Sequence, residues 1–226
     1  LIEAVSAAFP KTVVVVVAGS AVMMDWAPSV SAVVMAWYSG VEGGHGLADV
    51  LSGDVEPSGR LPFAIPSSES HLVDFDPDAS KATYDLLHGQ WKLDADGVGA
   101  AYPFGWGLGF GTCQVESAVV DDSGADAGRL SVAVVVTNTS HRRTSTIVQV
   151  YGEKLDSAFE RPPRRLIGFA KVSIEAGESR DVHIVIDLAQ LDVRSDGGWI
   201  RESGDYRLWV AQFAGDPAAI ACPISI

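Results

Sequence analysis

From residue 113 onward the sequence divides into short segments in which apolar and polar residues alternate. Val182, Ile184 and Ile186 form one such series, and side chains at this spacing lie on one face of a β-strand. Clusters of Asp, Ser and Gly separate the segments, which is typical of turns. The candidate strands are residues 114–120, 130–137, 144–151, 165–174, 180–186, 198–201, 206–213 and 220–226. This many short strands in about 110 residues indicate an antiparallel β-sandwich.

The first 66 residues carry a different pattern. A run of β-branched residues between Pro10 and Gly19 is typical of a strand that is buried on both faces of a parallel sheet. Helical patterns precede and follow this run, and a short strand comes last; these segments are residues 1–9, 29–38, 47–51 and 61–65. Since a sheet usually has about four to six strands, we predict a layered α/β fragment with a mostly parallel, incomplete sheet.

Residues 67–110 show no sustained period, and we interpret them as a linker between the two parts. Glycines at 105, 107, 109 and 111 do not follow a strand into a helix, so they predict a tight crossing between domains and not a nucleotide site. The predicted organisation is an α/β part at residues 1–66, a linker at 67–110 and a sandwich at 111–226.

Several motifs follow one another in a specific order. They are Gly43-Gly44, Pro57-Ser-Gly-Arg-Leu-Pro62, His88-Gly89, Pro103-Phe-Gly105, Val136-Thr-Asn138 and Gly204-Asp-Tyr206. With these motifs, nearly the whole chain resembles the C-terminal part of family 3 glycoside hydrolases, such as β-glucosidases. The resemblance implies that residues 1–66 end an α/β sandwich domain and that residues 111–226 form a fibronectin type III-like domain of immunoglobulin-like sandwich fold.

In that family the nucleophilic Asp lies in an N-terminal barrel and the acid/base Glu usually lies before the strand that residues 12–18 match. The resemblance therefore implies a retaining, exo-acting β-glycosidase, and it assigns no catalytic residue to this chain. Its substrate would be an oligosaccharide or aryl glycoside bound through the barrel. β-Xylosidase and arabinosidase specificities share these motifs and stay open. We expect residues 1–226 alone to be inactive.

Three residues are candidates for substrate binding. Glu42 precedes two glycines on a loop after a predicted helix, and such loops often line sites in α/β sheets. His88 lies in a linker loop that the resemblance places near the second domain, and Trp91 lies in irregular chain where an indole could stack on a sugar. The alternatives are a solvated glutamate, a structural histidine and a tryptophan that packs between domains.

Charge and composition exclude other classes of function. A net charge of −13 argues against a nucleic-acid partner. No apolar run reaches the ~18–20 residues that span a membrane. Asp74, Asp76 and Asp78 resemble a calcium loop, but Ala79 replaces its essential glycine, so no metal or cofactor is predicted. For Cys113 and Cys222, free thiols are favoured over a disulfide.

Two other functions stay open: a non-catalytic carbohydrate-binding or scaffold module that uses the sandwich alone, and a partner subunit of a split glycosidase. A homo-oligomer is also compatible with the sequence. The start at Leu1, inside a helical pattern, favours a chain that other residues precede. The sequence does not distinguish a cytoplasmic from a secreted protein, and it specifies neither the sugar nor the linkage.

Overall fold

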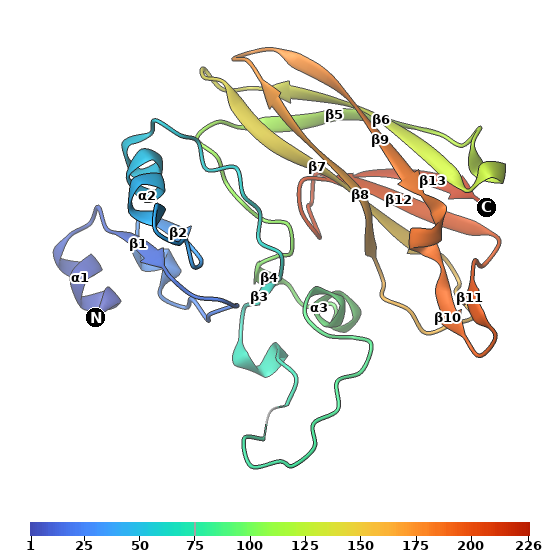
Figure 1. Cartoon of the computed structure of the whole chain (residues 1–226), viewed down its shortest axis with the longest axis horizontal. Helices are drawn as coiled ribbons and strands as arrows, with labels where there is room; N and C mark the ends of the chain where they lie inside the picture. Colours follow the sequence, from blue (N-terminus) through green and yellow to red (C-terminus); the bar gives the residue numbers. More distant parts are fainter. Residues whose placement is uncertain (75) are drawn as a thin grey trace.

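The computed structural model describes residues 1–74 and 76–226. Phe75, which belongs to the predicted linker and the calcium-like segment, lies outside the described residues. Figure 1 shows a β-sandwich formed by the C-terminal half and a smaller lobe formed by the N-terminal residues. Part of the chain between them contacts both bodies, and the stretch that precedes α3 forms a loop that projects away from them.

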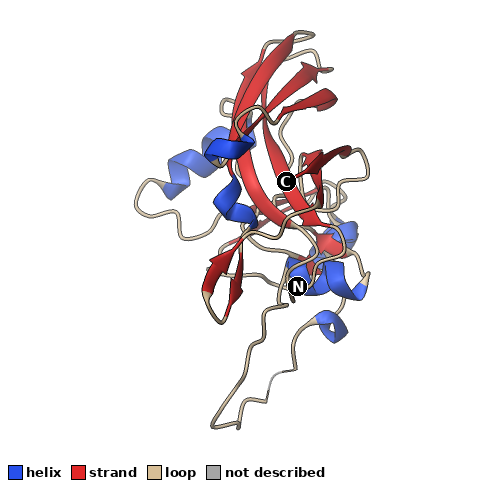
Figure 2. Ribbon diagram, turned by 90° about the vertical axis from the view of Figure 1, so that its right-hand side faces the viewer, coloured by secondary structure: helices blue, strands red, loops and turns tan. Residues whose placement is uncertain are grey.

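The sandwich consists of a three-stranded and a four-stranded antiparallel sheet, and Figure 2 shows how strands dominate this body. The first sheet has the order β5-β6-β9 and the second has the order β13-β12-β7-β8. All eight predicted segments form strands, and β10, which pairs with β11, is one strand that the pattern missed. The bounds are β5 Cys113–Asp121, β6 Arg129–Asn138, β7 Thr144–Lys154, β8 Arg165–Ile174, β9 Ser179–Asp187, β10 Val193–Ser195, β11 Gly198–Ile200, β12 Asp205–Ala211 and β13 Ile220–Ser225.

Alternating residues of these strands form the core between the sheets. Val132, Val134 and Val136 on β6 are buried, and Leu208 and Val210 on β12 are buried with them. Because every second side chain points inward, the period of two seen in the sequence becomes one buried face on each strand. Short 3₁₀ helices, η3 Ala125–Ala127 and η4 Leu188–Leu191, connect strands at the ends of the sandwich.

The N-terminal lobe contains α1 Ile2–Ala8, β1 Val13–Val16, η1 Ala27–Ser29, β2 Ala32–Met35 and α2 Gly43–Ser52. β1 and β2 pair in parallel and form a two-stranded sheet. The helix predicted at residues 29–38 is therefore wrong, because its apolar residues form β2 instead. Val14, Val15 and Val16 are half-buried, whereas the sequence predicted burial on both faces. β2 pairs along one edge of β1, and such pairing covers neither face of the strand.

The linker is more ordered than its sequence suggests. It contains η2 Glu69–His71, α3 Gln90–Asp96 and β4 Ala100–Tyr102, and β4 pairs with β3 Ile65–Pro66. The strand predicted at 61–65 is thus displaced toward residue 66. α3 begins after Gly89, ends at Gly97 in the left-handed conformation and buries Leu93. In Figure 1 this helix lies between the lobe and the sandwich.

Candidate functional site

The carboxylate of Glu56 joins the N-terminal lobe to the sandwich. It accepts hydrogen bonds from the Thr144 hydroxyl, from the Ser145 N–H at 2.8 Å and from the N–H groups of Phe110 (3.0 Å) and Gly111 (3.3 Å). Burial of the carboxyl opposes its ionisation, but these four donors outweigh it and hold the pKa of Glu56 below its ordinary value. Glu56 is therefore a charged acceptor that fixes β7 to the lobe.

Residues 105–111, which we call the glycine crossing, run between the lobe and the sandwich. Gly105 N–H donates to the carbonyl of Leu61 at 2.8 Å, and Leu61 N–H donates to the carbonyl of Trp106 at 2.8 Å. A β-carbon at any of the four glycines would collide with a neighbour: Gln149 at Gly105, the Gly59 carbonyl at Gly107 (2.5 Å), Glu56 at Gly109 (2.6 Å) and the Ser140 hydroxyl at Gly111 (2.5 Å). The predicted tight crossing is confirmed.

Gln149 is a buried polar residue of β7 that anchors the start of the glycine crossing. Its amide nitrogen donates to the carbonyl of Gly105 at 3.2 Å and to the carbonyl of Gln212. Its side-chain oxygen accepts the Tyr151 hydroxyl at 2.5 Å, and burial raises the pKa of Tyr151. Because both ends of the amide are satisfied, this buried side chain stabilises the joint.

Of the three predicted binding residues, the structure brings two together. His88 and Trp91 pack edge to face with their ring centroids 5.9 Å apart, just before and within α3. Trp91 is half-buried and lines a hollow of about 370 Å³ that the sandwich completes. Glu42 lies elsewhere, at the N-terminal end of α2, where its exposed carboxylate is 2.6 Å from Nδ1 of His45. A substrate-binding role for each of the three stays a prediction.

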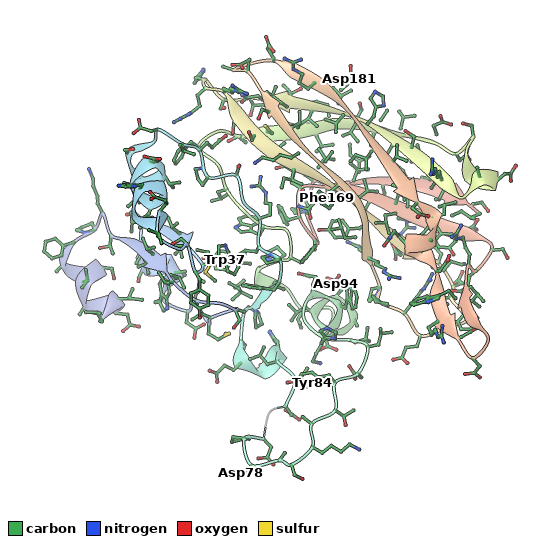
Figure 3. All side chains as sticks on the ribbon, viewed as in Figure 1. Trp37, Asp78, Tyr84, Asp94, Phe169 and Asp181 are labelled. Carbon is green, nitrogen blue, oxygen red and sulfur yellow. The ribbon has the colours of Figure 1, made fainter. Side chains whose placement is uncertain are left out.

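A second hollow, of about 660 Å³, lies on another side of α3. Figure 3 labels Asp94 on this helix, and burial raises the pKa of Asp94. Gln90 donates to Asp94 at 2.8 Å and accepts the Phe104 N–H at 2.9 Å, so it ties the helix to the chain before the glycine crossing. Trp106, on the wall of the hollow, packs edge to face against Phe213, and their ring centroids are 4.6 Å apart.

The site residues that the sequence missed are Glu56, Gln90 and Asp94. Glu56 stands in the stretch between two matched motifs, and nothing in its neighbours distinguishes it from the other acidic residues. Gln90 follows His88-Gly89 and begins a helix where the pattern indicated irregular chain. The sequence signal that was available is the glycine alternation at 105–111, because glycine at every second position indicates a segment that other parts of the chain approach closely.

Within residues 1–74 and 76–226, no three His, Cys, Asp or Glu side chains gather closely enough to hold a metal ion. No helix among these residues is long and apolar enough to cross a membrane. Cys113 and Cys222 are free thiols, and burial raises the pKa of both. The groups at the joint and around α3 can donate and accept hydrogen bonds and stack against a ring.

Two family models match the chain in the order that the fold shows. The model of the glycosyl hydrolase family 3 C-terminal domain matches residues 1–110. The model of the fibronectin type III-like domain matches residues 146–214. The first therefore covers the lobe, α3 and most of the glycine crossing, and the second covers β7 to β12 and the turn after it.

Curated relatives include beta-glucosidase B of Emericella nidulans, at 35% identity over 96% of this chain, and a beta-glucosidase of Rhizobium radiobacter, at 35% over 96%. The chain spans 28% of the length of each. Among solved structures, the beta-glucosidase DesR from Streptomyces venezuelae in complex with D-glucose has a TM-score of 0.91 at 29% identity, covering 100% of this chain and 30% of that one.

A second solved structure, the beta-D-glucoside glucohydrolase from Trichoderma reesei, has a TM-score of 0.90 at 25% identity. It covers 100% of this chain, which covers 35% of that one. Sequence, domain order and fold thus agree over nearly the whole chain. The chain belongs to glycosyl hydrolase family 3, of which it contains the C-terminal domain and the fibronectin type III-like domain.

Proposed function

We propose that the chain is the C-terminal portion of a retaining, exo-acting β-glucosidase that hydrolyses terminal O-glycosidic bonds. The observation that carries the proposal is the match of both domain models, in order, together with relatives that are named beta-glucosidases. Retaining hydrolysis needs two carboxyl groups about 5–5.5 Å apart, one as nucleophile and one as acid/base. In this proposal, both carboxyl groups lie outside residues 1–226.

The proposed role of this chain is to complete and brace the enzyme. Residues 1–66 are the end of a layered α/β domain, 67–110 are the linker and 111–226 are the sandwich. The parallel pairing of β1 with β2 supports a mostly parallel sheet that strands outside this chain extend. Glu56 and the glycine crossing then hold the sandwich against the α/β domain at a fixed angle.

The substrate in this proposal is an oligosaccharide or aryl β-glucoside with a terminal glucose. β-Xylosides and arabinosides are the runner-up substrates. Glu42, His88 and Trp91 are proposed to face the substrate side of the assembled enzyme, where an indole ring and a charged or polar group suit sugar recognition. Trp91 is the strongest of the three, because it already lines a hollow.

Hydrolysis of nitrophenyl β-glucoside, β-xyloside and α-arabinoside tests the proposal. The purified 226-residue chain should release no nitrophenol, whereas a longer form that includes the barrel should prefer the glucoside. Turnover by the isolated chain would show that its own carboxylates suffice, and a longer form that prefers the xyloside would replace the glucosidase assignment.

A further inference from the structure

The hollow beside Trp91 is rich in cations, although the chain as a whole is acidic. It lies between the segment that leads into α3, the strands β7 and β8, and the β10–β11 hairpin, and its volume is about 370 Å³. We call it the cationic hollow and define it by Trp91, Lys154, Arg165, Arg194 and Trp199. A net charge of −13 makes such a gathering of positive groups notable, because the average surface of this chain is negative.

Some charges around the cationic hollow are already balanced. Arg161 lies 3.5 Å from Glu202, and Asp192 lies 2.8 Å from Arg201. Each of these pairs combines opposite charges, so neither leaves much net field in the hollow. Glu160 is a further acidic residue on the wall, and it offsets one of the remaining cations.

The cations that define the hollow make their closest contacts with neutral groups, although Lys154 also interacts with the Glu202 carboxylate that pairs with Arg161. Lys154 donates to the carbonyl of Leu155 at 2.6 Å, and Arg165 donates to the carbonyl of Asp192 at 3.1 Å. The guanidinium of Arg194 lies 5.9 Å from the ring centroid of Trp199. A carbonyl or an indole ring orients a cation but leaves its charge in place, so three positive groups face this region against one carboxylate.

The aromatic groups of the hollow are placed for stacking. Trp199 is 63% exposed, so part of its indole ring is accessible, and the guanidinium of Arg194 lies beside that ring. Trp91, on the opposite segment, is half-buried and is held by the His88 ring. A ring-shaped ligand could therefore contact an indole while a charged substituent reaches a guanidinium.

We propose that the cationic hollow binds a saccharide unit that carries a carboxylate, with the sugar ring on Trp199 and the carboxylate on Arg194, the cation beside that ring. A volume of about 370 Å³ fits one sugar residue and lies within the range of ligand pockets, roughly 300–1,000 Å³. A planar guanidinium matches a carboxylate with two parallel hydrogen bonds. The choice of a saccharide rests on the proposed function, whereas the preference for an anion rests on the charges alone.

Titration of the 226-residue chain with D-glucuronate, followed by NMR, tests this proposal, and D-glucose is the neutral counterpart that differs at C6. Glucuronate should bind saturably, and about tenfold or more tighter than glucose, since hydrogen bonds to charged groups are the stronger ones. Added salt should weaken glucuronate binding and leave glucose binding unchanged. Equal affinity for the two sugars, or no saturation with glucuronate, overturns the proposal.

Matched variants locate the site. Arg194→Ala should weaken glucuronate binding about tenfold or more, and Trp199→Ala should weaken it about two- to tenfold. Arg180→Ala, on β9, and Phe169→Ala, whose ring is 64% exposed on β8, should change nothing. Equal effects of all four variants would contradict the assignment. Binding of a glutamate-rich peptide without binding of glucuronate would contradict it too, because the hollow would then recognise an acidic peptide and not a saccharide. Turnover of an aryl glucoside by the chain would overturn the proposed function and leave this binding result as it stands.

Discussion

Glu56 shows how one side chain can decide the relative placement of two domains. Its two carboxylate oxygens receive donors from β7 and from the glycine crossing, segments that are far apart in the sequence. Each donor on its own is ordinary. Together they surround one negative charge, and a charged acceptor makes stronger hydrogen bonds than a neutral one.

Replacement of Glu56 by glutamine should loosen this joint. Glutamine keeps the shape but turns one acceptor into a donor that faces the Ser145 or Gly111 N–H group. The side chain is only partly buried, so we expect a cost of about 1–2 kcal/mol, which is roughly a 5–30-fold loss of local protection. Hydrogen exchange of the Ser145 and Gly111 amides measures it. Glu116→Gln, at an exposed position on β5, is the control, and equal exchange in both variants would contradict the role of Glu56.

The same carboxylate should make the joint sensitive to acid. The folded-state pKa of Glu56 lies below 4.5, so the ionised form is favoured by folding. Its contribution is fully present above the unfolded value and is lost as pH falls through the folded pKa. Amide shifts of Ser145 and Gly111 should therefore titrate with a midpoint below 4.5. The same shifts in Glu56→Gln should stay flat, and a midpoint above 4.5 in the parent chain would refute the assignment.

The candidate residues could be predicted from the sequence only in part. The sequence points to His88 and Trp91 separately, and they prove to be neighbours because α3 brings a histidine before its first turn next to a tryptophan in it. Glu42 follows no helix at 29–38, contrary to the prediction, and its contact is with His45 on the same element. Glu56 could not be identified, because its partners come from segments that no local pattern links to it.

At the scale of elements, the glycine crossing depends on residues that have no β-carbon. The left-handed conformation at Gly105, with a φ of 79°, costs any residue with a β-carbon about 1–2 kcal/mol. A β-carbon there would also displace Gln149 and its hydrogen bonds. The crossing thus combines a backbone requirement with a packing requirement at one position.

Gly105→Ala should therefore lower the free energy of unfolding by about 2–4 kcal/mol. Thermal unfolding followed by calorimetry measures the loss. Gly99→Ala is the matched control, since a β-carbon at Gly99 would have no atom within 4 Å and the backbone there is not left-handed. That variant should stay within about 0.5 kcal/mol of the parent. Equal melting temperatures for the two variants would show that the crossing tolerates a side chain.

Strands that carry an alternating pattern were predictable, and the continuous apolar strand β2 was not. Val182, Ile184 and Ile186 alternate with polar residues, which fixes both the strand and its buried face. Val33, Val34 and Met35 form a short apolar run that fits a buried strand and one turn of a helix equally well. Only the parallel pairing with β1, which is a contact between separate segments, decides between them.

At the scale of the whole molecule, the sandwich and the lobe differ in how completely they bury their apolar side chains. The sandwich has a closed core between two sheets, whereas the lobe exposes Phe9, Val13 and Val17. Limited proteolysis should therefore cleave the lobe and the linker first and leave a fragment near residues 111–226 intact, as mass spectrometry would show. Sandwich fragments that appear before the lobe is cut would contradict the proposed boundary at residue 111.

The contact of Glu56 with Thr144 has a consequence for how the protein is made. The two residues lie 88 positions apart, so at about 5–20 residues per second a ribosome needs roughly 4–18 s to bring the partner out after Glu56. β7 is missing throughout that interval, and the glycine crossing, at residues 105–111, is missing for its first part. The N-terminal lobe is thus synthesised before the segments that stabilise it, and it lacks these contacts until the start of the sandwich has been made.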